Sequence, residues 1–217
     1  MKVTIAEEVL LLAHSEEEGK QLIGAAQLDA ALGGAILAEL ALAGRVELSE
    51  KKVTVTSGVP LGDDELDAAL NRMAEDGKAR KPVWWVQKLY SSKLRKRLLE
   101  RLAARGVLAE EKAKVLGLFP TTRWPEVDGT VEAEVRSRVA SALAGAEPEA
   151  RTAVLVAVLH AATLDRKAFP GADKKRIKEI TEGQWAGEAV ASTIHAINSV
   201  IMIAATTAAI SATTASS

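Results

Sequence analysis

The sequence contains no cysteine and only three histidines, and both shortages narrow the chemistry open to the protein. Without cysteine there are no disulfide bonds, no thiol catalysis and no zinc site with thiolate ligands. His14, His160 and His195 lie far apart, and no pair has the spacing of two metal ligands on one helix. Glycine-rich phosphate loops and Gly-x-Ser-x-Gly motifs are also missing. We therefore expect a protein that is not an enzyme, with no catalytic or metal-binding residues and no cofactor.

Aromatic residues are scarce, at 3% of the chain, although hydrophobic residues make up 48% and charged residues 26%. The latter two fractions are typical of a soluble globular protein. Richness in alanine and leucine, without a repeat of about 20 to 50 residues, favours packed helices over a β-sandwich or barrel. We predict a mainly α fold, a compact helical bundle with short β-hairpins. We expect one domain over residues 1–210 and a flexible tail over 211–217.

Long uncharged runs are few, and one of them is long enough to be a candidate membrane span. Residues 189–210 carry no charge and are numerous enough to cross a bilayer. Their serine, threonine, histidine and asparagine side chains are unfavourable in hydrocarbon without partners. We interpret this segment as a buried core helix. The N-terminus places two glutamates directly before its apolar run, which argues against a signal peptide.

A formal net charge of -1 conceals a strong separation of charge along the chain. Residues 1–76 hold 6 basic and 15 acidic side chains, whereas residues 77–105 hold 10 basic and 1 acidic side chain. We call residues 77–105 the basic block. A local positive charge of this size attracts anions such as nucleic acid, an anionic membrane or a phosphorylated ligand.

Local signals outline the first part of the chain. Thr4 and Glu7 have the spacing of a capping box, which begins a short apolar helix. A second helix is expected over about 25–42, with Gly44 in the left-handed position that follows a helix. Alternating polar and apolar residues on both sides of the polar turn 49–52 predict a β-hairpin.

The rest of the chain also reads as helices separated by short interruptions. Residues 62–76 begin with acidic side chains, which suit a helix N-terminus. The basic block then carries one or two helices that end at Gly106, and residues 107–124 predict a second hairpin. Beyond it, we expect helices interrupted at 145–148 and 170–171.

The helix that begins near Ser92 is the strongest candidate for an anion site. Its leucines form an apolar arc, and Arg95 falls inside that arc, where an arginine is costly unless an anion receives it. With Ser92 as N-cap, Arg95 lies beside unpaired backbone N–H groups, an arrangement that binds phosphate. Alternatively, Arg95 extends into solvent. We predict Arg95, Ser92 and Lys93 as ligands of the anion. Three further cations form a basic face toward a membrane: Lys88, Lys96 and Arg97.

The turn of the second hairpin gathers apolar side chains around a glycine and a proline. We predict Leu116, Leu118 and Phe119 as the apex of this hairpin. An exposed apex of this kind inserts into a membrane or forms a contact between subunits, whereas a covered apex belongs to the core. The sequence leaves both alternatives open.

Two other classes of function have partial support. The run of acidic residues over 63–67 matches the aspartate-rich spacing that holds Mg²⁺ in prenyl-chain synthases, but acids at a helix N-terminus explain it without a metal. A helix followed by a two-stranded hairpin is also how winged-helix proteins are built. A winged-helix-like protein that binds nucleic acid is therefore the alternative to a lipid-binding protein.

Four segments in this order resemble the Golgi phosphoprotein 3 family: Thr4 to Leu12, Gly34 to Arg45, Leu94 to Leu98 with Gly106 to Leu108, and Val154 to Ala162. The similarity extends over nearly the whole chain, and we expect a bacterial member. It implies a helical bundle with a projecting apolar hairpin. Family members in eukaryotes are peripheral membrane proteins that bind phosphatidylinositol 4-phosphate and help to retain glycosyltransferases.

The resemblance transfers only part of the family's headgroup pocket. A tryptophan and an arginine of that pocket fall at Gly24 and Gly33, and a pair of arginines falls at Ser92 and Arg95. By resemblance, we expect a cytoplasmic protein attached peripherally to the membrane through an anionic lipid and the inserting hairpin. Membrane-protein clients and a homo-oligomer formed through the hairpin are further expectations, and no nucleic acid partner is expected.

Overall fold

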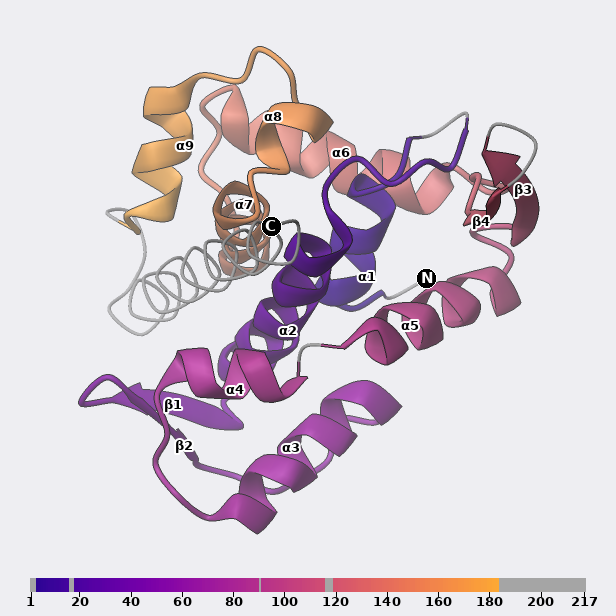
Figure 1. The fold of residues 1–217 in the computed structure, drawn as a ribbon. Coiled ribbons are helices and arrows are strands. Elements are labelled where there is room, and N and C mark those ends of the chain that lie inside the picture. Colours follow the sequence, from indigo (N-terminus) through magenta and orange to yellow (C-terminus); the bar gives the residue numbers. More distant parts are fainter. Residues whose placement is uncertain (1–2, 16–17, 90, 116–118, 184–217) are drawn as a thin grey trace, which may run out of the picture.

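The computed structural model describes residues 3–15, 18–89, 91–115 and 119–183, and it confirms the mainly α class (Figure 1). The helices are α1 (Ile5–Leu12), α2 (Ala25–Leu42), α3 (Asp64–Asp76), α4 (Pro82–Leu89), α5 (Ser92–Ala104), α6 (Thr130–Leu143), α7 (Ala150–Ala161), α8 (Asp165–Ala168) and α9 (Lys174–Thr181). The strands are β1 (Val46–Ser49), β2 (Lys52–Val55), β3 (Glu111–Val115) and β4 (Phe119–Arg123). The predicted helix over 189–210 and the predicted tail lie outside the described residues.

Helix α1 lies at the centre of the molecule, in contact with α2, α5, α6 and α7 (Figure 1). All eight of its residues are buried, which is unusual for a helix that carries two glutamates. The predicted capping box is confirmed: Thr4 Oγ1 accepts a hydrogen bond from the Glu7 N–H, and the Thr4 N–H donates to the Glu7 carboxylate at 2.7 Å. The cap fixes where this short central helix begins.

Helix α2 has the predicted bounds, and Gly44, two residues beyond its end, has a left-handed φ of 64° as expected. It packs against α1, α3, α4, α5 and α7, which is why nearly its whole circumference is apolar. Among the described residues, α2 alone is long and apolar enough to cross a membrane by length and composition. Of that window, 72% is buried inside the protein.

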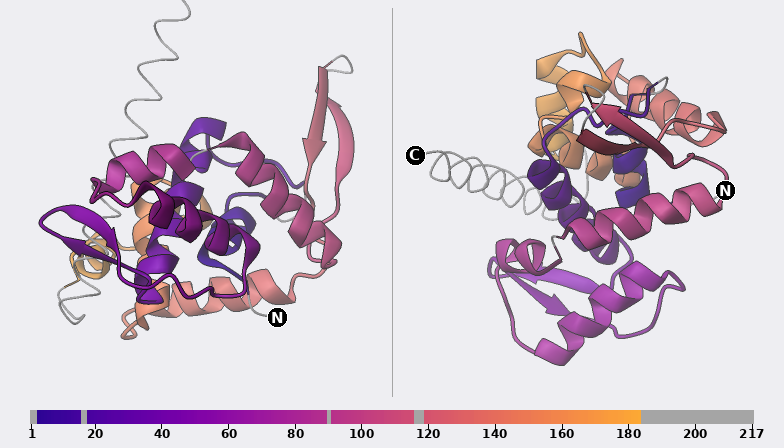
Figure 2. Two further views of the ribbon diagram at one scale, coloured as in Figure 1. Left: turned by 90° about the horizontal axis from the view of Figure 1, so that it is seen from below. Right: turned by 45° about the vertical axis from the view of Figure 1, so that its right-hand side comes forward.

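Both predicted hairpins form, and they lie at opposite ends of the molecule (Figures 1 and 2). In the first, Ser49 pairs with Lys52, and the turn residues Glu50 and Lys51 both have positive φ. In the second, Glu111 pairs with Arg123. Figure 2 shows the β3–β4 hairpin standing clear of the helices. We call it the projecting hairpin; its predicted apical residues Leu116 and Leu118 lie outside the described residues.

Glu7 joins α1 to α5 through buried ion pairs. Its side chain is fully buried, and its Oε1 accepts from Arg101 Nε at 2.8 Å and from Arg105 Nη1 at 3.2 Å. Arg101 also bonds Asp63, the residue that caps α3, at 2.8 Å. One carboxylate on α1 therefore positions the C-terminal half of α5 and, through Arg101, the start of α3.

Glu8 does the same for the other side of α1. It is 3% exposed and pairs with Arg138 on α6 and with Arg151 on α7. Arg151 Nη1 also binds Glu39 at 2.6 Å, and the second Glu39 oxygen accepts from the Ile5 N–H at 2.6 Å. These contacts link α1, α2, α6 and α7 in one network. We call the contacts of Glu7 and Glu8 together the α1 ion network.

Loss of the Glu7 charge is expected to destabilise the fold. Because Glu7→Gln leaves two arginines facing a buried neutral amide, it should lower the free energy of unfolding by about 3 kcal/mol. Chemical denaturation measures this change. The control is Lys96→Gln, which removes an ion pair with Glu100 in which the Lys96 side chain is 71% exposed. Its cost should stay below about 1 kcal/mol, and equal costs for both variants would contradict the role given to Glu7.

Candidate functional site

A cleft of about 480 Å³ opens at the base of the projecting hairpin, and we call it the hairpin cleft. Three segments that are distant in sequence meet there: the chain between α1 and α2, the first half of α5, and the end of β4. Its lining residues are His14, Gly19, Lys20, Gln21, Arg95, Leu99, Thr121, Thr122, Arg123 and Trp124. No carboxylate is among them, whereas three side chains are cations.

The close contact between Gly19 and Trp124 holds the hairpin cleft together. The Trp124 N–H donates to the Gly19 carbonyl at 3.2 Å, and the Trp124 side chain is buried. Gly19 has a φ of 58°, and a Cβ placed on it would lie 2.3 Å from the backbone of Trp124 and Pro125. Only glycine permits this approach of backbone to backbone.

Arg95 reaches the hairpin cleft from α5 and is held from below by α2. Its Nη1 donates to the Ala25 carbonyl at 3.1 Å and lies 3.2 Å from Asp29 Oδ1, and its side chain is 19% exposed. The angle to Asp29 does not make a hydrogen bond, so this buried carboxylate oxygen has no hydrogen-bond donor. Arg95 is therefore neither extended into solvent nor bare in the apolar arc, because α2 supplies a carbonyl and a partial counter-charge.

The prediction that Ser92 caps α5 is wrong. Ser91 is the N-cap: its extended backbone precedes the helix, and its Oγ accepts from the Leu94 N–H at 3.1 Å. Ser92 and Lys93 are then the first two helical residues, and the Arg95 N–H already bonds the Ser91 carbonyl at 3.3 Å. Arg95 can still present its guanidinium group to an anion, but its own backbone N–H is not free.

Burial changes the pKa of two side chains near Arg95. Burial raises the pKa of Asp29, and the positive charge of Arg95 opposes that rise. Burial lowers the pKa of His14, while its hydrogen bond to the Leu10 carbonyl opposes the change and Arg95 adds to it. Because a carbonyl oxygen can only accept, the 2.8 Å contact places a proton on His14 Nδ1.

Two of the cations in the hairpin cleft escaped prediction from the sequence. Lys20 lies in the loop before α2 and pairs with Glu18 at the surface, and Arg123 ends β4. Both lie outside the basic block, and neither belongs to a motif, so no local signal points to them. The pairing of β3 with β4 and the contact at Gly19 bring them to Arg95. Facing cations with no carboxylate in the lining suit an anion such as phosphate.

The other predicted cations lie elsewhere. Lys88, Lys93 and Arg97 line a second cleft of about 210 Å³ between α3, α4 and α5, which we call the helix cleft. Lys96 points into solvent and pairs with Glu100. Ser92 is exposed at the start of α5. The structure therefore separates Arg95 from the three predicted cations of the helix cleft, and it places Lys96 and Ser92 in neither cleft.

The two glycines at the family's pocket positions differ in their surroundings. Gly24 is the exposed N-cap of α2, next to the Ala25 carbonyl that binds Arg95, and a Cβ placed on it would have no atom within 4 Å. Gly33 is buried in the middle of α2. The first position thus leaves open space beside Arg95. Of the predicted hairpin apex, only Phe119 lies among the described residues, as the first residue of β4.

The acidic run over 63–67 has structural partners. Asp63 caps α3 by accepting from the Leu66 N–H at 3.1 Å, and Asp67 accepts from the Leu61 N–H at 2.6 Å. Glu65 binds Arg97 at 2.8 Å. This is the interpretation without a metal that the sequence offered, and the described residues contain no group of three or more histidine or acidic side chains placed to hold a metal ion.

The protein is thus a mainly helical protein with a projecting hairpin and a cationic cleft at the base of that hairpin. The family described as Golgi phosphoprotein 3 (GPP34) matches residues 5–197, and the chain belongs to this family. Vacuolar protein sorting-associated protein 74 of Eremothecium gossypii is 30% identical over 167 residues. That match covers 65% of the chain and 49% of the relative, so the chain spans about half the length of this curated relative.

The Gly19 contact can be tested by adding one methyl group. Gly19→Ala should push Trp124 away and destabilise the protein by more than about 1 kcal/mol, because it adds a clash to an unfavourable φ. Gly44→Ala is a matched control, since Gly44 has a similar φ and open space around it. Urea denaturation and amide exchange of the β3–β4 hairpin measure the two effects. If Gly44→Ala loses as much stability, the close approach at Gly19 is unimportant.

The buried imidazole of His14 should make stability depend on pH. Its folded pKa is lowered, so the unfolded chain binds this proton more readily than the native protein does. Stability should therefore fall as the pH drops below about 6.5, the ordinary histidine value. His14→Gln removes this contribution, and its unfolding free energy should fall less over the same pH range. Parallel slopes for variant and wild type would contradict the assignment.

Proposed function

We propose that the protein is a non-enzymatic peripheral membrane protein that binds the phosphorylated headgroup of an anionic phospholipid in the hairpin cleft. The observation that carries the proposal is the convergence of Lys20, Arg95 and Arg123 at the base of the projecting hairpin. A cationic cleft there can hold a headgroup while the hairpin apex enters the bilayer. By family resemblance, the headgroup is similar to phosphatidylinositol 4-phosphate.

The three cations have different roles in this proposal. Arg95 is held by its hydrogen bond to the Ala25 carbonyl, so its guanidinium group is already oriented when the headgroup arrives. A planar guanidinium group binds phosphate through two N–H donors at once. Lys20 and Arg123 add charge from the loop before α2 and from the end of β4, which draws an anionic surface toward the cleft.

Selectivity is expected to be lower than a complete family pocket would give. Gly24 offers no aromatic ring and Gly33 no guanidinium group. The cleft is therefore expected to recognise the charge of the phosphate more than the inositol ring of the headgroup. The relative's name links it to vacuolar protein sorting, and we extend to this chain only a role at a membrane. In this proposal the protein works from the cytoplasmic side, holds membrane-protein clients and can pair with a second copy through its hairpins.

Vesicle sedimentation tests the proposal with variants that should weaken vesicle binding and one that should strengthen it. Arg95→Gln, Lys20→Gln and Arg123→Gln should each weaken binding to vesicles of phosphatidylcholine with phosphatidylinositol 4-phosphate by several-fold to about ten-fold. Asp29→Asn should strengthen binding, because it removes the carboxylate that competes for Arg95. Phe119→Ser should weaken binding if the apex inserts.

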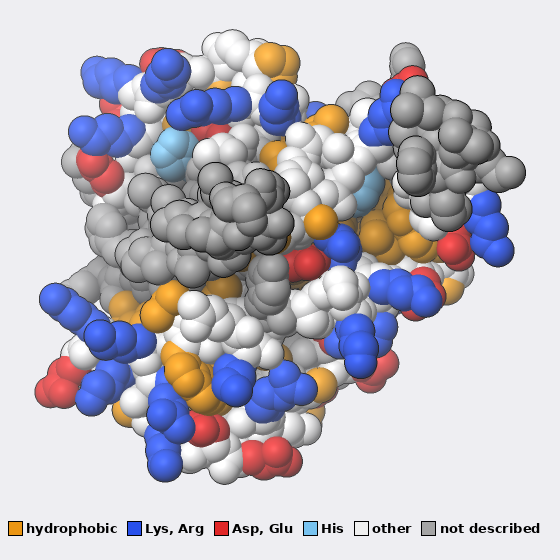
Figure 3. All heavy atoms as spheres, viewed as in Figure 1, with side chains coloured by type: hydrophobic (Ala, Val, Ile, Leu, Met, Phe, Trp, Pro, Cys, Tyr) orange, Lys and Arg blue, Asp and Glu red, His pale blue; other side chains and the backbone are white. Residues whose placement is uncertain are grey.

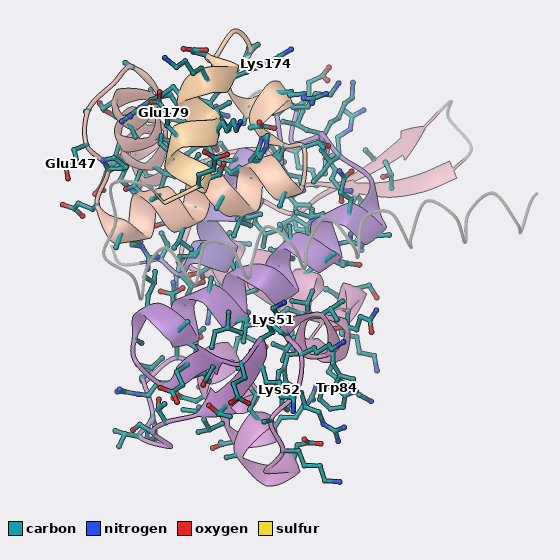
Figure 4. All side chains as sticks on the ribbon, turned by 90° about the vertical axis from the view of Figure 1, so that its left-hand side faces the viewer. Lys51, Lys52, Trp84, Glu147, Lys174 and Glu179 are labelled. Carbon is teal, nitrogen blue, oxygen red and sulfur yellow. The ribbon has the colours of Figure 1, made fainter. Side chains whose placement is uncertain are left out.

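The control is Lys174→Gln, which makes the same charge change on α9, away from the projecting hairpin (Figures 1 and 4). Its vesicle binding should match the wild type. Equal binding to pure phosphatidylcholine vesicles would overturn the electrostatic part of the proposal. A gel shift with duplex DNA, run at the same salt concentrations, addresses the winged-helix alternative. Tight DNA binding without vesicle binding would replace the proposal.

A further inference from the structure

The helix cleft gathers cations from three helices. Arg72 comes from α3, Lys88 from α4, and Lys93 and Arg97 from α5, whereas Glu65 is the one carboxylate in the lining. In Figure 3, lysine and arginine side chains are visible over α4. The cleft has a volume of about 210 Å³ and shares no lining residue with the hairpin cleft.

The carboxylate in the helix cleft is already occupied. Glu65 forms two hydrogen bonds with Arg97, one of them 2.8 Å long, and its side chain is only 14% exposed. This pairing neutralises Arg97 and leaves the charges of Arg72, Lys88 and Lys93 without a partner inside the cleft.

Two of the remaining three cations, Arg72 and Lys88, contact neutral groups. Arg72 Nη1 donates to the Lys88 carbonyl at 3.2 Å, which leaves its other N–H groups available. Lys88 Nζ lies 5.3 Å from the ring centre of Trp84. Within the described part of the chain, no carboxylate lies at ion-pair distance from any of these three cations. Three converging positive charges repel one another, and a bound anion would remove that cost.

The five arginines of the basic block have carboxylate partners, whereas Arg72, Lys88 and Lys93 have none among the described residues. Arg80 pairs with Asp76, Arg95 with Asp29, Arg97 with Glu65, Arg101 with Glu7 and Asp63, and Arg105 with Glu7. The helix cleft is the place in the basic block where several cations share one hollow and only one acid. Its positive charge is therefore available to a ligand.

We propose that the helix cleft is a second anion-binding site, which takes a phosphate group. On α5, Lys93 and Arg97 project about 160° away from Arg95 around the helix axis. The site is thus independent of the hairpin cleft and of the function proposed for it. Lys88 and Lys93 supply point charges, and Arg72 supplies a directed pair of N–H donors. The phosphate belongs either to a small soluble molecule or to a lipid headgroup.

Amide NMR of the full chain, titrated with inorganic pyrophosphate at low ionic strength, tests the site residue by residue. Amides of α4 and the start of α5 should shift on titration. The double variant Arg72→Gln/Lys93→Gln should raise the dissociation constant for pyrophosphate, measured at these amides, by about ten-fold or more. Glu65→Gln should lower this dissociation constant by about two-fold or more, because it removes the one negative charge among the lining residues of the helix cleft.

The matched control is Arg95→Gln, which removes one cation of the hairpin cleft and should leave the helix-cleft amides titrating as in the wild type. All the exchanged helix-cleft residues except Glu65 are exposed, and unfolding curves verify that each variant folds. Absence of shifts at α4 and α5 would overturn the proposal. So would shifts that Arg95→Gln abolishes, or a double variant that binds pyrophosphate as the wild type does.

Vesicles of phosphatidylcholine with phosphatidic acid then identify the source of the phosphate, with the Arg72→Gln/Lys93→Gln exchange made in an Arg95→Gln background so that the hairpin cleft is already weakened. If the double variant loses both pyrophosphate and vesicle binding, the ligand is a lipid headgroup. If it loses pyrophosphate but keeps vesicle binding, the ligand is soluble. Both results support the site. Failure of the helix cleft leaves the vesicle results for Arg95 and Lys20 unaffected, so the two proposals fail separately.

Discussion

Two buried carboxylates on α1 determine where the arginines of the surrounding helices can lie. Glu7 and Glu8 are fully removed from water or nearly so, and a carboxylate in that position is tolerated only with cations around it. Arginines from α5, α6 and α7 meet this requirement. The bundle therefore has a polar centre inside an apolar core, and the packing of its helices around α1 must satisfy both.

This requirement also explains the separation of charge along the chain. The acidic first third and the basic block are largely each other's partners, because α1, α2 and the start of α3 supply the acids that hold α5. Most of the positive charge that looks available in the sequence is consumed inside the fold. Part of what remains lies in two small clefts on different sides of α5, where a few side chains can act together on a ligand.

The helix boundaries were largely predictable because each depends on a few neighbouring residues. Thr4 with Glu7, Asp63 and Gly44 signal helix ends by local hydrogen bonds and φ alone. At the start of α5 the same reasoning was wrong by one residue, because Ser91 and Ser92 are adjacent and the local sequence allows either to cap the helix.

The candidate sites were predictable only in part. Arg95 was predicted because an arginine inside the apolar arc of a helix is unusual. Lys20 and Arg123 were missed because their meeting depends on tertiary contacts far along the chain. The neutralisation of Arg97 by Glu65 was also invisible, since the two residues are 32 positions apart. Local signals therefore located the helix, but not which of its cations remain available.

The backbone contact between Gly19 and Trp124 has a mechanical consequence. It clamps the end of β4 to the loop before α2, while the rest of the projecting hairpin extends away from the helices. The hairpin is thus attached to the helical body close to Gly19. Arg123 directly precedes Trp124 in the chain, and Arg95 belongs to α5. The spacing of these two cations therefore depends on one backbone contact, which couples the geometry of the hairpin cleft to the position of the hairpin base.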